Sequence, residues 1–345
     1  MNDHYEVTIG IPVYRSAAFI RDTMLSVLSQ TFADIEFLVV DDCGEDGSVD
    51  QILLLQKTHP RGKHIRILEN GTNRGVSYSR NRIIDETRGR YLYFMDSDDI
   101  IEPQTIQILH DAIVRNHAQI VYGSYDIADH VNGNPVRVYQ KERRLFHRED
   151  DLALYAFQYI QIFHVSACNH LVDLEFLRQT GIRFANVSYW EDMIYTTELV
   201  TRITEAVTMP DVTYHYILHT DSLSHYRQRE RLNKKEIQQN VAVLNYLKRK
   251  CSTLTGKPYL SFLAYNIEVN SFYVVCHILK NVRRIHPEYS YFEMREILAH
   301  PLSLATILKF RQNKVSNSCF WVMGKLPLCL FAPVVWLLGR IKMRA

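Results

Sequence analysis

Apolar segments of strand length alternate with segments of helical periodicity in the N-terminal third of the chain. The strand segments are residues 7–13, 35–40, 65–68 and 91–95, and the helical segments are residues 17–29, 48–58, 76–87 and 103–115. Strands that alternate with helices of roughly 10 to 15 residues form βαβ units, which build a parallel sheet. We therefore predict an α/β fold with a mainly parallel sheet, whose ligands bind beyond the carboxyl ends of its strands.

Polar residues follow each predicted strand. The segments are Pro12-Val13-Tyr14-Arg15, Asp41-Asp42-Cys43-Gly44, residues 70–75 and Asp96-Ser97-Asp98-Asp99. Three aspartates within four residues repel one another unless a cation neutralises them, and hard oxygen ligands suit Mg or Mn. The sequence therefore favours a divalent metal site at this edge of the sheet. Two simpler roles stay open: Asp98 or Asp99 caps the helix that begins near Pro103, and Asp41-Asp42 forms a turn with Gly44.

Two common nucleotide-binding motifs are absent from the chain. No G-x-G-x-x-G follows the first strand, and no G-x-x-x-x-G-K-[ST] occurs. Because these motifs build the phosphate sites of dinucleotide-dependent dehydrogenases and P-loop NTPases, their absence disfavours both classes. A phosphate ligand would instead be bound by a metal ion and by arginine.

Five motifs carry a resemblance to a known family. They are Ile11-Pro12-Val13-Tyr14, Leu28-Ser29-Gln30-Thr31-Phe32, Val39-Val40-Asp41-Asp42, Asn73-Arg74-Gly75 with Ser79-Arg80-Asn81, and Asp96-Ser97-Asp98-Asp99. In order and spacing they resemble the motifs of family-two inverting glycosyltransferases with the GT-A fold, of the type that builds bacterial surface polysaccharide. Ile182-Arg183-Phe184 and Trp190-Glu191-Asp192-Met193 resemble the acceptor-side segment of that family. The resemblance implies a GT-A catalytic domain over residues 1–225.

The resemblance also implies roles on the donor side. Asp98 and Asp96 would hold Mg or Mn on the diphosphate of a nucleotide sugar, with Asp98 the direct ligand and Asp96 and Ser97 nearer to the ribose and donor sugar. The nucleotide base would lie over Pro12, Val13 and Tyr14. Asp42, or else Asp41, would accept a hydrogen bond from a uracil N–H group. Arg80 would offer a cation to the nucleotide, and its alternative is a solvated helical arginine.

On the acceptor side, the resemblance makes Asp192 of the Glu191-Asp192 pair the general base. Inversion requires a base on the face opposite to the diphosphate, where it takes the proton of the acceptor hydroxyl. The pair precedes a helical pattern, so the alternative is a pair of acids favoured by the helix dipole.

The chain departs from the family pattern at two places. Asn169-His170-Leu171 stands where relatives often carry Asn-Lys-Leu, and His219 takes the usual basic position before Ser222-Leu223-Ser224. His215, His219 and His225 also allow a zinc site, which the absence of an H-E-x-x-H motif disfavours. One of these histidines lining the acceptor or phosphate site is the other alternative.

The C-terminal third differs from the rest in charge. Residues 1–225 hold 20 Lys and Arg against 32 Asp and Glu, a net charge of −12, whereas residues 226–345 hold 20 against 6, a net charge of +14. Helical periodicity without alternating strands predicts a helical appendage here. Basic regions bind nucleic acid or anionic membrane surfaces, and no aromatic and basic module typical of nucleic-acid binding is present. We therefore expect no nucleic-acid partner.

Residues 326–339 form an uncharged stretch that is shorter than the roughly 20 residues of a spanning helix. Trp321 and Trp336 stand near it, with several cations: Lys309, Arg311, Lys314, Lys325, Arg340, Lys342 and Arg344. This pattern predicts an interfacial membrane segment near residues 317–345. A buried terminal helix or a dimer contact is the alternative.

The ends and the cysteines indicate a cellular location. The N-terminus lacks the apolar core of a signal peptide, and the six cysteines form no C-x-x-C pair. We expect reduced thiols and a cytoplasmic protein that associates peripherally with the inner face of the cell membrane.

The predicted function is metal-dependent, inverting transfer of a sugar from a nucleotide sugar, with UDP as the expected carrier. The acceptor is a hydroxyl of a glycan or lipid-linked oligosaccharide in surface polysaccharide synthesis. Two alternatives stay open: an inactive nucleotide-sugar-binding scaffold, and a nucleotidyltransferase, which also needs paired acids.

Overall fold

The computed structural model describes residues 4–129, 135–163, 166–218 and 231–342. The chain forms two compact units, which we describe separately. Unit 1 comprises residues 1–152 and 160–220, and unit 2 comprises residues 153–159 and 221–345. The predicted boundary at residue 225 lies outside the described residues. The six cysteines are all within the described ranges, and none of them forms a disulfide.

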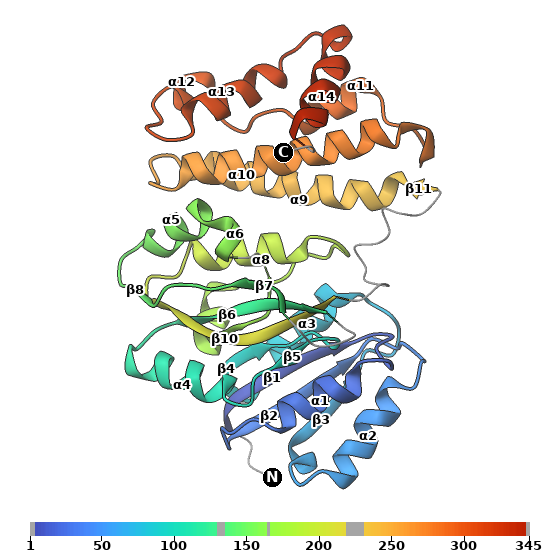
Figure 1. Ribbon diagram of the computed structural model, residues 1–345, viewed down its shortest axis with the longest axis vertical. Coiled ribbons are helices and arrows are strands. Elements are labelled where there is room, and N and C mark those ends of the chain that lie inside the picture. Colours follow the sequence, from blue (N-terminus) through green and yellow to red (C-terminus); the bar gives the residue numbers. More distant parts are fainter. Residues whose placement is uncertain (1–3, 130–134, 164–165, 219–230, 343–345) are drawn as a thin grey trace. The chain divides into compact units, whose positions relative to one another are not determined.

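Unit 1 is built on a ten-stranded sheet with the order β3-β2-β1-β4-β9-β6-β10-β5, to which β7 and β8 add through β6 and β10 (Figure 1). The strands are β1 (Tyr5–Val13), β2 (Ile35–Asp41), β3 (Ile65–Glu69), β4 (Gly89–Phe94), β5 (Ile100–Ile101), β6 (Ile120–Asp129), β7 (Pro135–Tyr139), β8 (Arg144–Phe146), β9 (His170–Asp173) and β10 (Ala206–Leu218). The first four strands pair in parallel, as predicted.

The first four helices of unit 1 follow the predicted alternation, and three more come later in the chain. They are α1 (Ile20–Leu28), α2 (Ser48–Thr58), α3 (Val76–Glu86), α4 (Thr105–Arg115), α6 (Ile160–Phe163), α7 (Leu174–Thr180) and α8 (Glu191–Val200). The strands β1, β2 and β4 form the centre of the core, where Ile9, Phe37 and Leu92 are fully buried. Apolar residues on both faces are typical of a parallel strand that helices cover, and α3 packs on β1 and β2.

The second half of the sheet is mixed. The strand β9 lies between β4 and β6 and is antiparallel to both, whereas β6 and β10 are parallel. The sequence does not predict β9, because four residues carry too little periodicity to mark a strand. This strand joins the parallel half, which the sequence predicts, to the strands that follow it in the sheet.

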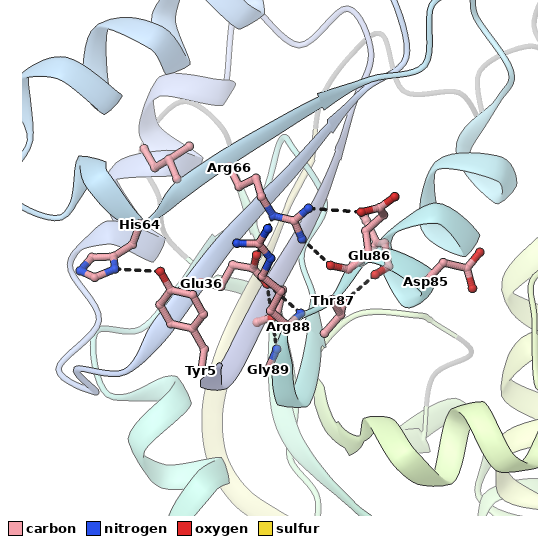
Figure 2. Close-up of polar contacts among 12 residues, drawn as sticks. Tyr5, Glu36, His64, Arg66, Asp85, Glu86, Thr87, Arg88 and Gly89 are labelled. Carbon is pink, nitrogen blue, oxygen red and sulfur yellow. Dashed lines mark hydrogen bonds and ion pairs between the residues drawn. The ribbon is translucent and has the colours of Figure 1, made fainter. Parts of the chain in front are cut away.

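A buried acid ties the amino ends of the strands together at the edge opposite to the candidate site (Figure 2). Glu36 on β2 is 1% exposed and accepts hydrogen bonds from Thr8 Oγ1 at 2.7 Å, Arg66 Nε at 2.8 Å and the Arg88 backbone N at 3.1 Å. Arg66 also reaches the carboxylate and the backbone carbonyl of Glu86, at the end of α3. The network therefore links three strands to a helix.

Unit 2 is helical around two long helices, α9 (Lys234–Thr253) and α10 (Leu260–Lys280). The remaining elements are α5 (Asp151–Gln158), which mostly belongs to this unit, β11 (Leu232–Asn233), β12 (Ile285–His286), α11 (Tyr291–Ile297), α12 (Leu304–Ile307), α13 (Lys314–Met323) and α14 (Leu328–Lys342). Lys248 on α9 forms an ion pair with Glu268 on α10, with 3.0 Å between Nζ and Oε1, and donates hydrogen bonds to the carbonyls of Ile297 and Ala299 at 2.7 and 2.8 Å. This buried ion pair fixes α9 and α10 to the end of α11.

By length and composition alone, α10 is the one described helix that could cross a membrane. More than half of its apolar stretch is buried inside the protein, and Glu268 within it is fully buried. A helix in the core of a globular unit can have the same length and apolar composition. We therefore describe α10 as the central helix of unit 2.

The Glu36 network predicts a stability difference between two neighbouring acids. We expect Glu36→Gln to lower the free energy of unfolding by about 3–5 kcal/mol, because it leaves Arg66 without its buried partner. Glu86→Gln is the matched control, since it removes a half-exposed carboxylate from the same arginine and should change stability by less than about 1 kcal/mol. Urea unfolding measures both, and equal losses would contradict the assignment.

Candidate active site

The carboxyl ends of β1, β2 and β4 bring the predicted donor-side segments together. The Asp42 backbone N donates to the Val13 carbonyl at 2.9 Å, and Met95 N donates to the Gly10 carbonyl at 3.0 Å. Pro12 and Val13 are buried, whereas Tyr14 is 41% exposed. Tyr14 is therefore the residue of this segment that can present a ring to a ligand.

Asp42 holds the loop before α3. Its Oδ1 accepts from Asn70 Nδ2 and the Arg74 backbone N, and its Oδ2 accepts from the Gly75 backbone N, all at 2.8 Å. Asp41 accepts from the Cys43 backbone N at 3.1 Å, and burial raises the pKa of Asp41. Asp41 thus makes a local backbone contact, and both the turn and the hydrogen bond from either acid to uracil stay predictions.

Arg80 lies at the centre of the site. Its Nη1 contacts Glu191 Oε1 and Asp192 Oδ1, and its Nη2 contacts Asp96 Oδ1, each at 2.8 Å. The Arg80 side chain is only 4% exposed, so the alternative of a solvated helical arginine is wrong. One guanidinium therefore joins the acidic motif after β4 to the acid pair that begins α8. These contacts leave its predicted role toward the nucleotide as a prediction.

Two further side chains of α3 hold the acceptor segment. Ser77 Oγ donates to the Val187 carbonyl at 2.7 Å, and Asn81 exchanges two hydrogen bonds of 2.9 Å with the backbone of Phe184. The Phe184 ring stacks on Tyr195 of α8 with the ring centroids 4.1 Å apart. Positions 77, 80 and 81 share a face of α3, because residues three and four apart are neighbours on a helix. Sequence reasoning marks Asn81 and Phe184 only as parts of motifs and misses Ser77 and Tyr195.

Asp192 has the environment of a general base. Burial raises its pKa to about 7, with Arg80 opposing the rise and Glu191 and Asp96 adding to it. A carboxylate with a pKa near 7 is both ionised and basic enough to accept a proton at neutral pH. Both acids also stand in the first turn of α8, so the helix-dipole alternative holds alongside their ion pairs with Arg80.

The acids that follow β4 differ in their burial and in their partners. Asp99 is 1% exposed and accepts from Tyr214 Oη at 2.5 Å and the Ile217 backbone N at 2.8 Å. Helix α4 begins after Gln104 without a side-chain cap, so the helix-cap alternative is wrong for Asp99. Asp96 keeps 30% of its side-chain surface exposed, and Ser97 and Asp98 are half-buried. Asp96 and Asp98 are thus the acids of this motif that a ligand can reach.

His215 lies between two carboxylates: its Nδ1 is 2.8 Å from Asp126 and its Nε2 is 2.9 Å from Glu102. Within residues 4–129, 135–163, 166–218 and 231–342, no group of three or more His, Cys, Asp or Glu side chains is arranged to hold a metal. His219, His225 and the Ser222-Leu223-Ser224 stretch lie outside these ranges.

The other departure from the family pattern, His170, is a buried side chain on β9. Its ring lies against Tyr122 and Tyr195, with centroids 5.3 and 6.1 Å apart, and burial lowers its pKa to about 4. His170 is therefore neutral at physiological pH. It does not supply the positive charge that a lysine would carry at this position.

Comparison with protein families identifies the family of this chain. Residues 8–181 match the profile described as Glycosyl transferase family 2. The chain belongs to this family. The resemblance seen in the sequence is thereby confirmed.

Two relatives in this family match part of the chain. An uncharacterized glycosyltransferase from Haemophilus influenzae is 24% identical over 201 residues, which are 58% of this chain and 74% of that protein. The Escherichia coli UDP-Glc:alpha-D-GlcNAc-diphosphoundecaprenol beta-1,3-glucosyltransferase WfgD is 31% identical over 134 residues, which are 39% of this chain and 50% of that protein. The match thus spans half the length of the E. coli family member.

Two solved structures share the fold. Staphylococcus aureus TarS 1-349 in complex with UDP-GlcNAc has a TM-score of 0.65 at 15% identity, covering 98% of this chain and 92% of that chain. The mannosyltransferase PcManGT from Pyrobaculum calidifontis, in complex with GDP-Man and Mn²⁺, has a TM-score of 0.54 at 15% identity, covering 97% and 87%. The predicted α/β GT-A fold with a helical C-terminal region is confirmed.

The Arg80 cluster predicts how a variant's stability depends on pH. In Arg80→Met the three carboxylates lose their cation, and the pKa of Asp192, which burial already raises, rises further. A raised acid pKa gives stability that is present at low pH and lost as pH rises through the folded-state pKa. The difference in melting temperature from the parent protein should therefore be larger at pH 8 than at pH 5.

Arg178→Met is the matched control for that measurement. Its guanidinium donates three hydrogen bonds to backbone carbonyls, of Ile84, Asp85 and Thr87, none of which titrates. The control should lose the same stability at both pH values. A pH-independent loss in Arg80→Met would contradict the charge assignment.

Proposed function

We propose that this family 2 member is a metal-dependent, inverting hexosyltransferase. It moves a sugar from a UDP-sugar to a hydroxyl of a glycan or lipid-linked oligosaccharide, in cytoplasmic steps of surface polysaccharide synthesis. The observation that carries the proposal is the Arg80 cluster, which holds an acid of the donor-side motif and the acceptor-side acid pair on one guanidinium. The E. coli relative is named for UDP-glucose and a lipid diphosphate acceptor, and TarS was solved with UDP-GlcNAc, which supports the choice of UDP.

The proposed chemistry places Asp192 on the acceptor hydroxyl. The hydroxyl oxygen forms a bond to the anomeric carbon while the bond from that carbon to the diphosphate oxygen breaks, and the electron pair leaves with the diphosphate. The hydroxyl proton passes to the Asp192 carboxylate, whose raised pKa suits it to accept the proton. Arg80 Nη1 holds Asp192 and Glu191 in place. Because attack comes from the face opposite to the leaving group, the product is inverted.

The acids after β4 fit a divalent cation. Asp96 and Asp98 are partly exposed carboxylates with one residue between them. Both oxygens of Asp99 accept hydrogen bonds, from Tyr214 and Ile217. Carboxylate oxygens are the ligands that Mg and Mn prefer, with the remaining positions left to phosphates and water. When bound, the ion would neutralise charge on the diphosphate leaving group. The mannosyltransferase neighbour was solved with Mn²⁺.

Asp192→Asn tests the base. We expect kcat to fall by about 10²–10⁴-fold with little change in the KM for the UDP-sugar, because the amide cannot take the proton. In the parent protein, kcat/KM should rise with pH through about 7 as Asp192 ionises. Release of UDP and the anomeric configuration of the product are measured together by NMR.

The exposed Asp111→Asn is the matched control for this variant and should keep parent kinetics. Full activity in Asp192→Asn, or a product that retains the donor configuration, would overturn the assignment. Formation of a nucleoside triphosphate or a new nucleotide linkage would instead identify a nucleotidyltransferase. Tight UDP-sugar binding without turnover in the parent protein would identify a scaffold.

Asp98→Ala tests the metal site through binding alone. We expect Mn²⁺ to strengthen UDP binding in the parent protein, and the variant to lose roughly a hundredfold of that affinity because the ion loses a ligand. In EDTA the two proteins should bind UDP equally. Titration calorimetry with and without Mn²⁺ measures this, and equal enhancement by Mn²⁺ in both proteins would rule out Asp98 as a ligand.

A further inference from the structure

Helix α14 is apolar on two faces. Its inner face carries Phe331 and Val335, both fully buried, and Gly339, where an added Cβ would lie 2.8 Å from Cys276 Sγ of α10. This face packs on α10 and α11 within unit 2. The other side of the helix is exposed, with Leu330 at 52% and Leu337 at 55%. A helix that is apolar on all sides is normally buried on all sides, but the outer face of α14 is exposed.

The exposed apolar residues extend from α14 to α13. We call this set the α13–α14 surface, and it consists of Val322, Leu328, Leu330, Trp336, Leu337 and Leu338, each 39% to 55% exposed. The two helices follow one another through a short turn, in which Lys325 N donates to the Val322 carbonyl at 2.9 Å. Exposed apolar side chains repeated along consecutive helices mark a surface that binds a partner or a membrane.

The charged residues of the segment that forms this surface are all basic. No Asp or Glu occurs after Glu296, whereas seven Lys and Arg follow it. Two of these cations lie near tryptophans of α13 and α14: the Arg340 guanidinium is 3.9 Å from the ring centroid of Trp336, and Lys325 Nζ is 6.0 Å from that of Trp321. An apolar surface whose own segment carries cations and no acids is complementary to an apolar layer bordered by anions.

We propose that the α13–α14 surface docks this protein on an anionic lipid bilayer. Its leucines and Trp336 enter the boundary between headgroups and acyl chains, while Lys325 and Arg340 contact lipid phosphates. Helix α14 has 15 residues and a length of about 22 Å at 1.5 Å per residue, which is short of the roughly 30 Å hydrocarbon core. Its inner face is already committed to α10. The helix therefore lies in the interface and does not cross it.

This proposal does not depend on the proposed transferase chemistry. The surface belongs to unit 2, and every residue of the candidate active site belongs to unit 1. Membrane docking and sugar transfer therefore have separate tests, and the failure of one leaves the other unchanged.

Vesicle flotation of the full chain tests the docking surface. We expect the parent protein to float with vesicles that contain phosphatidylglycerol and to stay at the bottom with phosphatidylcholine vesicles. The double variant Leu330→Glu, Leu337→Glu should lose flotation, because it places carboxylates where acyl chains would lie. High salt should release only part of the bound parent protein, since salt screens the cations but not the apolar contacts.

Leu54→Glu is the matched control, because Leu54 is 60% exposed on α2 of unit 1. It should float as the parent protein does. All these positions are exposed, so the melting temperatures should agree within a few degrees, and transfer to a water-soluble acceptor should be equal.

Two outcomes would overturn the proposal. One is a parent protein that ignores anionic vesicles or binds neutral vesicles equally well. The other is a parent dimer, measured by light scattering, that the double variant dissociates without any vesicle binding, which would make this surface an interface between two copies of the chain.

Discussion

The buried guanidinium of Arg80 is the interaction on which the candidate active site depends. It binds three carboxylates at 2.8 Å and thereby holds Asp96 of the donor-side motif in the same cluster as Glu191 and Asp192. When all three acids are ionised, one arginine leaves an excess of two negative charges in a poorly solvated place. Burial raises the pKa of Asp192, and the carboxylates of Glu191 and Asp96 raise it further. The same excess of negative charge favours the divalent cation that we propose for Asp96 and Asp98.

The acids at the two edges of the sheet in unit 1 differ in their burial and in their hydrogen-bond partners. At the amino ends of the strands, Glu36 is almost fully buried and receives three hydrogen bonds, so it ties strands together and is closed to ligands. Asp99 plays a similar part beside the site, where Tyr214 and a backbone N–H occupy it. The acids that keep some exposure, Asp96 and Asp192, are those with which a substrate can exchange a metal or a proton. Acids whose oxygens all have hydrogen-bond partners within the protein stabilise the fold. Acids that keep some exposure can bind a ligand or accept a proton.

In unit 2, too, some groups are enclosed by neighbouring helices and others are left exposed. Its ion pair between Lys248 and Glu268 is enclosed, and the inner face of α14 is covered by α10. The outer face of α14 is left apolar, and no acid occurs in the chain after Glu296. A lipid-linked acceptor would be held at a bilayer, so a docking surface on this unit would raise the concentration of that acceptor near the enzyme without taking part in the chemistry.

The sequence by itself determined the parallel half of the sheet, because each strand and helix there has its own apolar period and each loop its own polar residues. It also marked the acids of the site, since short motifs are local. It did not show that Arg80 is buried, or that Ser77 and Asn81 clamp the acceptor segment, because those contacts join residues 103 to 112 positions apart. The role of Asp99 was likewise decided by a distant partner, Tyr214. Local patterns fix which segments become strands and helices, whereas burial and charge pairing depend on which segments meet, and only the tertiary structure decides that.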